Sequence, residues 1–118
     1  MKLLIVDDSL IMRKAVERSL AEKNFAVDFA GDGEEGLRLF KEKLPDLVTL
    51  DISMPKMDGI TCLTEMLKVK KDAKILMITS QTDKVTAQEV LAKGAVGVLG
   101  KPFTSAQILE KINEIMGV

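Results

Sequence analysis

Short apolar runs alternate with longer amphipathic segments along this chain, and the pattern predicts a sheet of five strands. The expected strands cover residues 2–6, 25–30, 47–50, 74–78 and 96–99. Continuous apolar runs of this length, joined by helix-like segments, are typical of parallel strands buried on both faces. In the second run apolar and polar residues alternate only imperfectly, which indicates an edge strand of the sheet.

Between these runs, apolar residues recur at helical spacing. The expected apolar faces are Ile11, Met12, Ala15, Ser19 and Leu20 after a Ser9 cap, Leu37 and Phe40 after the turn at 31–33, Leu63 and Leu67 in a helix over 60–68, and Ile108, Leu109, Ile112, Ile115 and Met116 in the last helix. A fourth helix is expected from about Lys84 to near Gly94. Thr104 and Gln107 fit a capping box that opens the last helix, which Gly117 closes. Five βα units predict a doubly wound α/β fold with helices on both faces.

Four of the apolar runs lead directly to reactive polar residues. Asp7 and Asp8 follow the first run, Asp51 the third, Thr79 the fourth and Lys101 the fifth. Ligands of open α/β sheets bind just beyond the carboxyl ends of the strands. We therefore expect three carboxylates, a hydroxyl and an amine to share one crevice.

The three carboxylates predict a divalent cation. Isolated Asp side chains ionise near pH ~4, so Asp7, Asp8 and Asp51 would crowd negative charge at neutral pH. Mg²⁺ suits this environment, because it binds oxygen ligands and often uses one or two carboxylates together with water and phosphate. In the alternative interpretation, Asp7 and Asp8 only end a strand and cap the next helix. Two adjacent acids and a third at another strand end favour the metal.

Asp51 is the candidate nucleophile, because a carboxylate beside Mg²⁺ can form an aspartyl phosphate. Lys101 and Thr79 would then contact two phosphoryl oxygens, assisted by backbone N–H groups after Asp51. Lys101 otherwise only pairs with a carboxylate. It precedes Pro102, which favours an extended backbone and allows a cis bond.

Composition limits the other possibilities. The 118 residues fit one domain over 1–118 without an attached output domain, and the net charge of -1 gives no bulk attraction to nucleic acid or membrane. No stretch approaches the ~20 apolar residues of a membrane span, so a cytoplasmic protein is expected. The chain has no His, which excludes zinc clusters built on His and Cys-His catalysis. The lone Cys62 is expected to be a small buried hydrophobe.

With these residues placed, the chain resembles the response-regulator receiver domains of two-component signalling, especially the single-domain chemotaxis type. The resemblance spans essentially the whole chain and rests on the motifs LLIVDDS, LDISMPKMDG, ILMITS and GKPF. It implies a flavodoxin-like sheet of order 2-1-3-4-5 with five helices.

The resemblance also implies a site. Asp51 would accept phosphate from a histidine kinase, with Mg²⁺ bound by the carboxylates of Asp8 and Asp51, by Asp7 largely through water, and by the backbone carbonyl of Ser53. Thr79 would move toward the phosphoryl group and Lys101 would pair with it.

The implied output is a conformational switch read by a partner. The switch would bias a face formed by the fourth helix, the fifth strand and the last helix, including Val98 and Ser105, which a downstream protein reads while the receiver itself is a monomer. One departure is Val98, which stands three residues before Lys101 where many members carry an aromatic switch residue. Ser53 and Gln81 would flank the phosphoryl group and set its lifetime.

Two other classes of function fit less well. A phosphatase with an aspartyl nucleophile usually needs a second acid two residues later, where this chain has Ser53. A flavodoxin-like flavin carrier lacks an aromatic for stacking, since there is no Trp or Tyr. A purely structural interaction domain that never takes phosphate is the other alternative, but only the phosphoacceptor explains all the strand-end residues at once. Within the receiver interpretation, a chemotaxis protein, a phosphorelay intermediate and a sporulation-type regulator all remain open.

Overall fold

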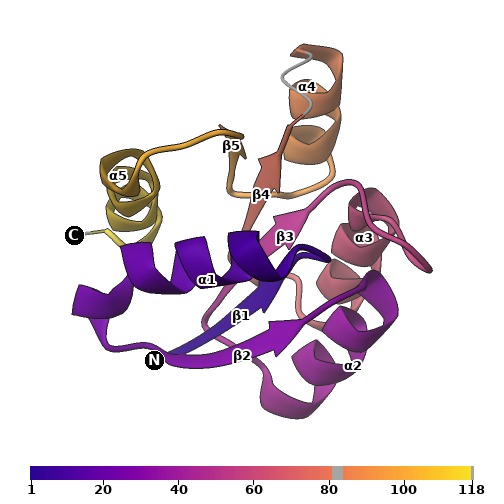
Figure 1. The fold of residues 1–118 in the computed structure, drawn as a ribbon. Coiled ribbons are helices and arrows are strands. Elements are labelled where there is room, and N and C mark those ends of the chain that lie inside the picture. The colour runs from indigo at the N-terminus through magenta and orange to yellow at the C-terminus, as the bar shows by residue number, and fades with distance from the viewer. Residues whose placement is uncertain (81–83, 118) are drawn as a thin grey trace.

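Five parallel strands form one sheet in the order β2-β1-β3-β4-β5 (Figure 1). The structure is a computed structural model that describes residues 1–80 and 84–117. The strands are β1 (Lys2–Val6), β2 (Ala26–Ala30), β3 (Leu47–Asp51), β4 (Ile75–Thr79) and β5 (Gly97–Gly100). The order confirms the flavodoxin-like topology that the resemblance implied, with β2 at an edge.

Helices cover both faces of the sheet. They are α1 (Leu10–Ser19), α2 (Gly33–Lys43), α3 (Gly59–Val69), α4 (Lys84–Ala92) and α5 (Ser105–Met116), with a 3-10 turn, η1 (Ala21–Lys23), after α1. Figure 1 shows α1 and α5 on one side of the sheet and α2, α3 and α4 on the other. The described part of the chain contains no helix that is both long and apolar enough to cross a membrane.

Two apolar cores, one on each face, fix this arrangement. Val16 of α1 and Ile108 of α5 are buried against Ile5 and Leu76 of the sheet. Phe40 of α2 and Leu63 of α3 are buried in the core on the opposite face. Successive strand residues point to opposite faces, so each central strand supplies both cores.

The expected caps Ser9 and Thr104 are confirmed, and Asp32 and Asp58 cap two further helices. The side-chain oxygens of Ser9, Asp32, Asp58 and Thr104 accept hydrogen bonds from backbone N–H groups in the first turns of α1, α2, α3 and α5. Thr104 and Gln107 form the predicted capping box. Cys62 is fully buried, and burial raises the pKa of its thiol to about 12, so it acts as a small hydrophobe.

The apolar face of α1 was predicted incorrectly at two positions. Leu20 is buried as expected, but Ile11 is 80% exposed, and Val16, which was left out of the predicted face, is buried. The Ser9 cap sets the rotation of α1, and residues four apart on a helix share a face, so Val16 and Leu20 turn inward together and Ile11 turns outward.

Strand boundaries also moved by one residue. β4 and β5 each begin and end one residue later than expected, and the ladder continues until Thr79 lies opposite Gly100. Pairing between backbones, and not the end of an apolar run, determines where a strand stops. Thr79 is therefore held inside the sheet.

Gly59 holds the loop between β3 and α3 close to the end of β3. The Gly59 N–H donates to the Ile52 carbonyl at 2.7 Å. A Cβ on Gly59 would lie 2.6 Å from the Ile52 Cα and would also meet the Asp51 carbonyl oxygen. The backbone therefore returns against Asp51 only because residue 59 has no side chain.

We predict that Gly59→Ala lowers the free energy of unfolding by about 1–3 kcal/mol, because the added methyl group overlaps backbone that cannot move aside. Urea unfolding followed by circular dichroism measures the change. Gly31→Ala is the control, since its Cβ would meet only the flexible Arg13 side chain at 3.4 Å. Equal stability of both variants would contradict this packing argument.

Candidate functional site

Three carboxylates meet where the two central strands end. Asp7 and Asp8 follow β1, and Asp51 ends the neighbouring β3, whose Leu50 is in register with Val6. One carboxylate oxygen from each of the three Asp residues lies within 4.8 Å of the others. Asp7 and Asp51 are buried, whereas Asp8 is exposed. Such an oxygen-only donor set at the molecular surface fits a hard divalent cation.

Lys101 provides the positive charge of this cluster. Its ammonium donates to Asp7 Oδ2 at 2.9 Å and lies 3.5 Å from Asp51 Oδ1, and its side chain is largely buried. The Lys101 N–H donates to the Thr79 carbonyl at 2.7 Å, and the Lys101–Pro102 bond is cis, as the sequence allowed. The end of β5 thus directs this side chain across β4 toward the carboxylates.

Lys101 compensates the negative charge of Asp51 only in part. Burial, followed by the nearby negative charge of Asp7, raises the pKa of Asp51 above its ordinary value, and the attraction of Lys101 only partly opposes this. Asp7 has closer partners, because the Ser9 N–H donates to its Oδ1 at 2.9 Å. The site therefore holds an unfavourable negative charge at Asp51 when no cation is bound.

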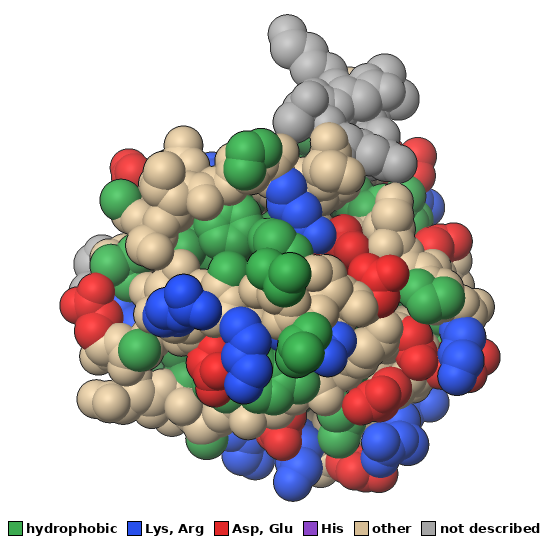
Figure 2. All heavy atoms as spheres, in the orientation of Figure 1, with side chains coloured by type: hydrophobic (Ala, Val, Ile, Leu, Met, Phe, Trp, Pro, Cys, Tyr) green, Lys and Arg blue, Asp and Glu red, His purple; other side chains and the backbone are tan. Residues whose placement is uncertain are grey.

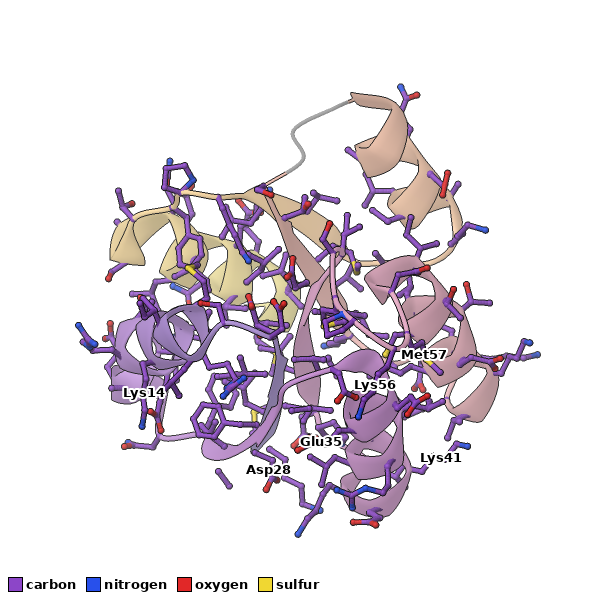
Figure 3. The ribbon with its side chains drawn as sticks, turned by 45° about the vertical axis from the view of Figure 1, so that its right-hand side comes forward. Lys14, Asp28, Glu35, Lys41, Lys56 and Met57 are labelled. Atoms are coloured by element: carbon purple, nitrogen blue, oxygen red, sulfur yellow. The ribbon has the colours of Figure 1, made fainter. Side chains whose placement is uncertain are left out.

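The loop after β3 forms one wall of the site. Ser53 is exposed and, together with Asp8, lines an open groove of about 720 Å³ that reaches the start of α3. Lys56 has a left-handed backbone with a φ of 68°. Its Nζ lies 3.7 Å from Oδ2 of Asp32, the residue that caps α2, so the loop contacts the start of that helix. Figure 3 shows Lys56 and Met57 beside this helix.

The three expected switch residues, Thr79, Val98 and Ser105, lie on β4, β5 and α5. Thr79 is buried at the end of β4. Val98 is half-buried opposite Met77, so it faces the same side of the sheet as Thr79. Ser105 is exposed at the start of α5, where its Oγ lies 3.0 Å from Ser19 Oγ of α1. Gln81 lies outside the described residues.

Two contributors to the site were missed from the sequence. One is the Ser9 N–H that binds Asp7, and the other is Arg13, whose Nη1 donates to the Asp7 carbonyl oxygen at 2.7 Å. Arg13 follows the Ser9 cap by one helical turn, and helical side chains tilt toward the N-terminus of their helix. That spacing was the available signal, since it directs Arg13 back toward the end of β1.

The surface around the site mixes acidic and apolar character. Figure 2 shows hydrophobic side chains in the middle of the visible face and acidic side chains directly to their right, beyond the end of β1 in the same view of Figure 1. Leu10 and Ile11, in the first turn of α1, are 59% and 80% exposed.

Comparisons with known proteins agree on one family. The family model of the response regulator receiver domain matches residues 3–113. The chain is 36% identical over 116 residues to the chemotaxis protein CheY of Bacillus subtilis, covering 98% of this chain and 97% of that protein. It is equally 36% identical, over 117 residues and 98% of each chain, to protein CcdB of the same organism.

Solved structures agree with these matches. A CheX–CheY–BeF3–Mg complex from Borrelia burgdorferi superposes with a TM-score of 0.95 at 36% identity, covering 98% of this chain and 89% of that chain. Chemotaxis protein CheY4 of Vibrio cholerae superposes with a TM-score of 0.89 at 33% identity, over 97% of each chain.

The charge at Asp51 predicts how metal-free stability changes with pH. Because folding raises the pKa of Asp51, the folded state binds this proton more tightly than the unfolded state, and stability falls as pH rises from the ordinary value through the raised one. Asp51→Asn should therefore melt a few degrees higher than wild type near neutral pH without Mg²⁺. The difference should vanish at acidic pH, where Asp51 is protonated.

Thermal melts across this pH range measure the effect. Asp46→Asn is the control, because the Lys2 N–H holds the pKa of Asp46 below its ordinary value, so this variant should gain no stability. An Asp51→Asn variant that melts no higher than wild type near neutral pH would refute the charge-crowding account.

Proposed function

Because this chain belongs to the response regulator receiver domain family, we propose that Asp51 accepts a phosphoryl group and that the protein signals through the change that follows. The similarity to chemotaxis CheY proteins confirms the resemblance drawn from the sequence. The protein is a receiver domain of a two-component system. The assignment of individual residues below is our proposal.

The observation that carries this proposal is the position of Asp51 among its neighbours. Its carboxylate lies close to those of Asp7 and Asp8 and 3.5 Å from the Lys101 ammonium. Phosphoryl transfer needs mainly positioning and neutralisation of charge on the phosphoryl oxygens. Asp51 can supply the attacking oxygen, while Lys101 can turn from a carboxylate to a phosphoryl oxygen.

Asp7, Asp8 and Asp51 would hold Mg²⁺, together with the backbone carbonyl of Ser53. When bound, Mg²⁺ neutralises charge on the phosphoryl oxygens. Burial, and after it the negative charge of Asp7, raises the pKa of Asp51. This supports the assignment, because a bound cation would stabilise the ionised carboxylate. The Lys101 bond to Asp7 holds one carboxylate in place beside the other two.

Thr79 and Lys101 would report the phosphorylated state to the rest of the molecule. The two residues are connected through their backbones, because the Lys101 N–H donates a hydrogen bond to the Thr79 carbonyl. If each binds a phosphoryl oxygen, β4 and β5 shift together, and the conformer with the stronger phosphoryl contacts becomes more populated. Val98 is too small for the rotation expected of an aromatic, so the coupling would run through Thr79 and the packing of α4 and α5.

The output would be a partner protein that binds the face formed by α4, β5 and α5, including Val98 and Ser105. Leu91 of α4 and Val96 before β5 are 48% and 43% exposed, which supplies apolar area there. A histidine kinase would be the phosphodonor and chemotaxis the pathway, with a phosphorelay as the alternative. Catalysis by the chain itself would be limited to phosphotransfer and autodephosphorylation, by a monomer in the cytoplasm.

Asp51 is expected to gain one phosphoryl group when the protein is incubated with acetyl phosphate and Mg²⁺, because its carboxylate is the nucleophile. Intact-mass spectrometry measures the adduct. Asp51→Asn should gain none, and chelation of Mg²⁺ should abolish labelling of the wild type. An unmodified wild type, or equal labelling of Asp51→Asn, would rule out the proposed function.

Thr79→Ala is expected to take up phosphate from acetyl phosphate nearly as wild type does, yet to lose most of its phosphorylation-dependent binding to a captured partner. The hydroxyl is needed to report the phosphoryl group and not to form the bond. Thr49→Val is the matched control, since Thr49 is also a buried strand threonine and its hydroxyl has no hydrogen bond among the described residues. Undiminished partner binding by Thr79→Ala in a pull-down would contradict this role.

A further inference from the structure

Arg13, on the surface of α1, reaches the backbone of the turn that contains Asp7 and Asp8. Its Nη1 donates a 2.7 Å hydrogen bond to the Asp7 carbonyl oxygen, from a position one turn after the Ser9 cap. The same nitrogen lies beside Gly31, where an added Cβ would be 3.4 Å away. The guanidinium therefore fills the space between the turn after β1 and the turn that leads from β2 to α2.

This hydrogen bond acts on Asp8 through the peptide that joins it to Asp7. The carbonyl oxygen of Asp7 and the N–H and Cα of Asp8 lie in one rigid plane. A donor that fixes the carbonyl also fixes the direction in which the Asp8 side chain leaves the backbone. Asp8 needs such support most, because its side chain is exposed, whereas the Asp7 carboxylate is held directly by the Ser9 N–H and Lys101.

Electrostatics alone would give Arg13 the opposite role. A cation beside three carboxylates competes with a bound metal ion, so removing its charge would tighten metal binding. Holding the Asp7–Asp8 peptide would have the reverse effect, because a ligand that loses its support must be ordered when the metal binds. The sign of the change in Mg²⁺ affinity therefore separates the two roles.

We propose that Arg13 is a positioning residue that orients the Asp7–Asp8 peptide and thereby prepares Asp8 to bind Mg²⁺. This inference rests on the proposed Mg²⁺ site. In this inference α1 helps to form the site through Arg13, which does not itself bind the metal.

The test is the Mg²⁺ dissociation constant of the unphosphorylated protein, measured by isothermal titration calorimetry at constant ionic strength. Arg13→Met should bind Mg²⁺ about tenfold more weakly than wild type, at the low end of the ~10–100-fold losses seen when a supporting group of a metal site is removed. Arg13→Lys, which keeps the charge but not the planar donor group, should bind about threefold more weakly. If Arg13→Met does not fold, Arg13→Lys still provides the test.

Lys14→Met is the matched control. Lys14 is the next residue of α1, but its ammonium lies over the Phe29 ring, 5.8 Å from the centroid, and Figure 3 shows it on the flank of the helix. Losing this charge should leave the Mg²⁺ affinity unchanged or slightly tighter. Unfolding without Mg²⁺ is measured in parallel, because a purely structural role would lower stability without changing the dissociation constant.

Equal or tighter Mg²⁺ binding by the Arg13 variants, with normal binding by wild type, would overturn the inference and leave the proposed function intact. Absence of Mg²⁺ binding by wild type would overturn both.

Discussion

The contact of one ammonium with two carboxylates is the constraint on which the site depends. The Lys101 ammonium lies 2.9 Å from Asp7 Oδ2 but 3.5 Å from Asp51 Oδ1, so it compensates the negative charge of Asp51 less than that of Asp7. Burial and the charge of Asp7 then raise the pKa of Asp51. The metal-free protein is thus held in a state that a cation or a phosphoryl group would change, because either one supplies new partners for these three side chains.

The fold makes this crowding tolerable by building the site on backbone that cannot move. Asp7 continues the pairing of β1, since its N–H donates to the Ala30 carbonyl at 3.0 Å. Asp51 ends a fully buried strand, and Gly59 brings the following loop back against it. Packing of α1 and α5 against one face, and of α2, α3 and α4 against the other, keeps these strand ends aligned. Stability elsewhere in the molecule offsets the cost of the clustered charge.

The sequence alone was sufficient for the fold class and for the residues that meet at the strand ends. The strongest signals were apolar runs that end in Asp7, Asp51, Thr79 and Lys101, because parallel strands place such residues at one edge. The rotation of α1 was less predictable. Ile11 and Val16 are equally apolar, and only the geometry of the cap decides which of them is buried.

Contacts made through the backbone were the hardest to foresee. The hydrogen bonds of Arg13 to the Asp7 carbonyl oxygen and of the Ser9 N–H to the Asp7 carboxylate depend on how the turn after β1 folds, and the spacing of Arg13 from the Ser9 cap was only an indirect signal. The distance between Lys101 and its two partners likewise depends on the register of β4 and β5. The residue types indicate which chemistry to propose for this site, while its balance of charge depends on how the chain folds in three dimensions.

The most direct test of this account is a crystal structure of the protein with Mg²⁺ and beryllium fluoride, an anion that resembles a phosphoryl group in shape and charge. We expect the beryllium of the fluoride complex on a carboxylate oxygen of Asp51 and a Mg²⁺ ion bound by Asp8 and Asp51. The Lys101 ammonium should have turned from Asp7 toward a fluorine. Beryllium on another carboxylate, or a Mg²⁺ ion bound away from these aspartates, would contradict the account.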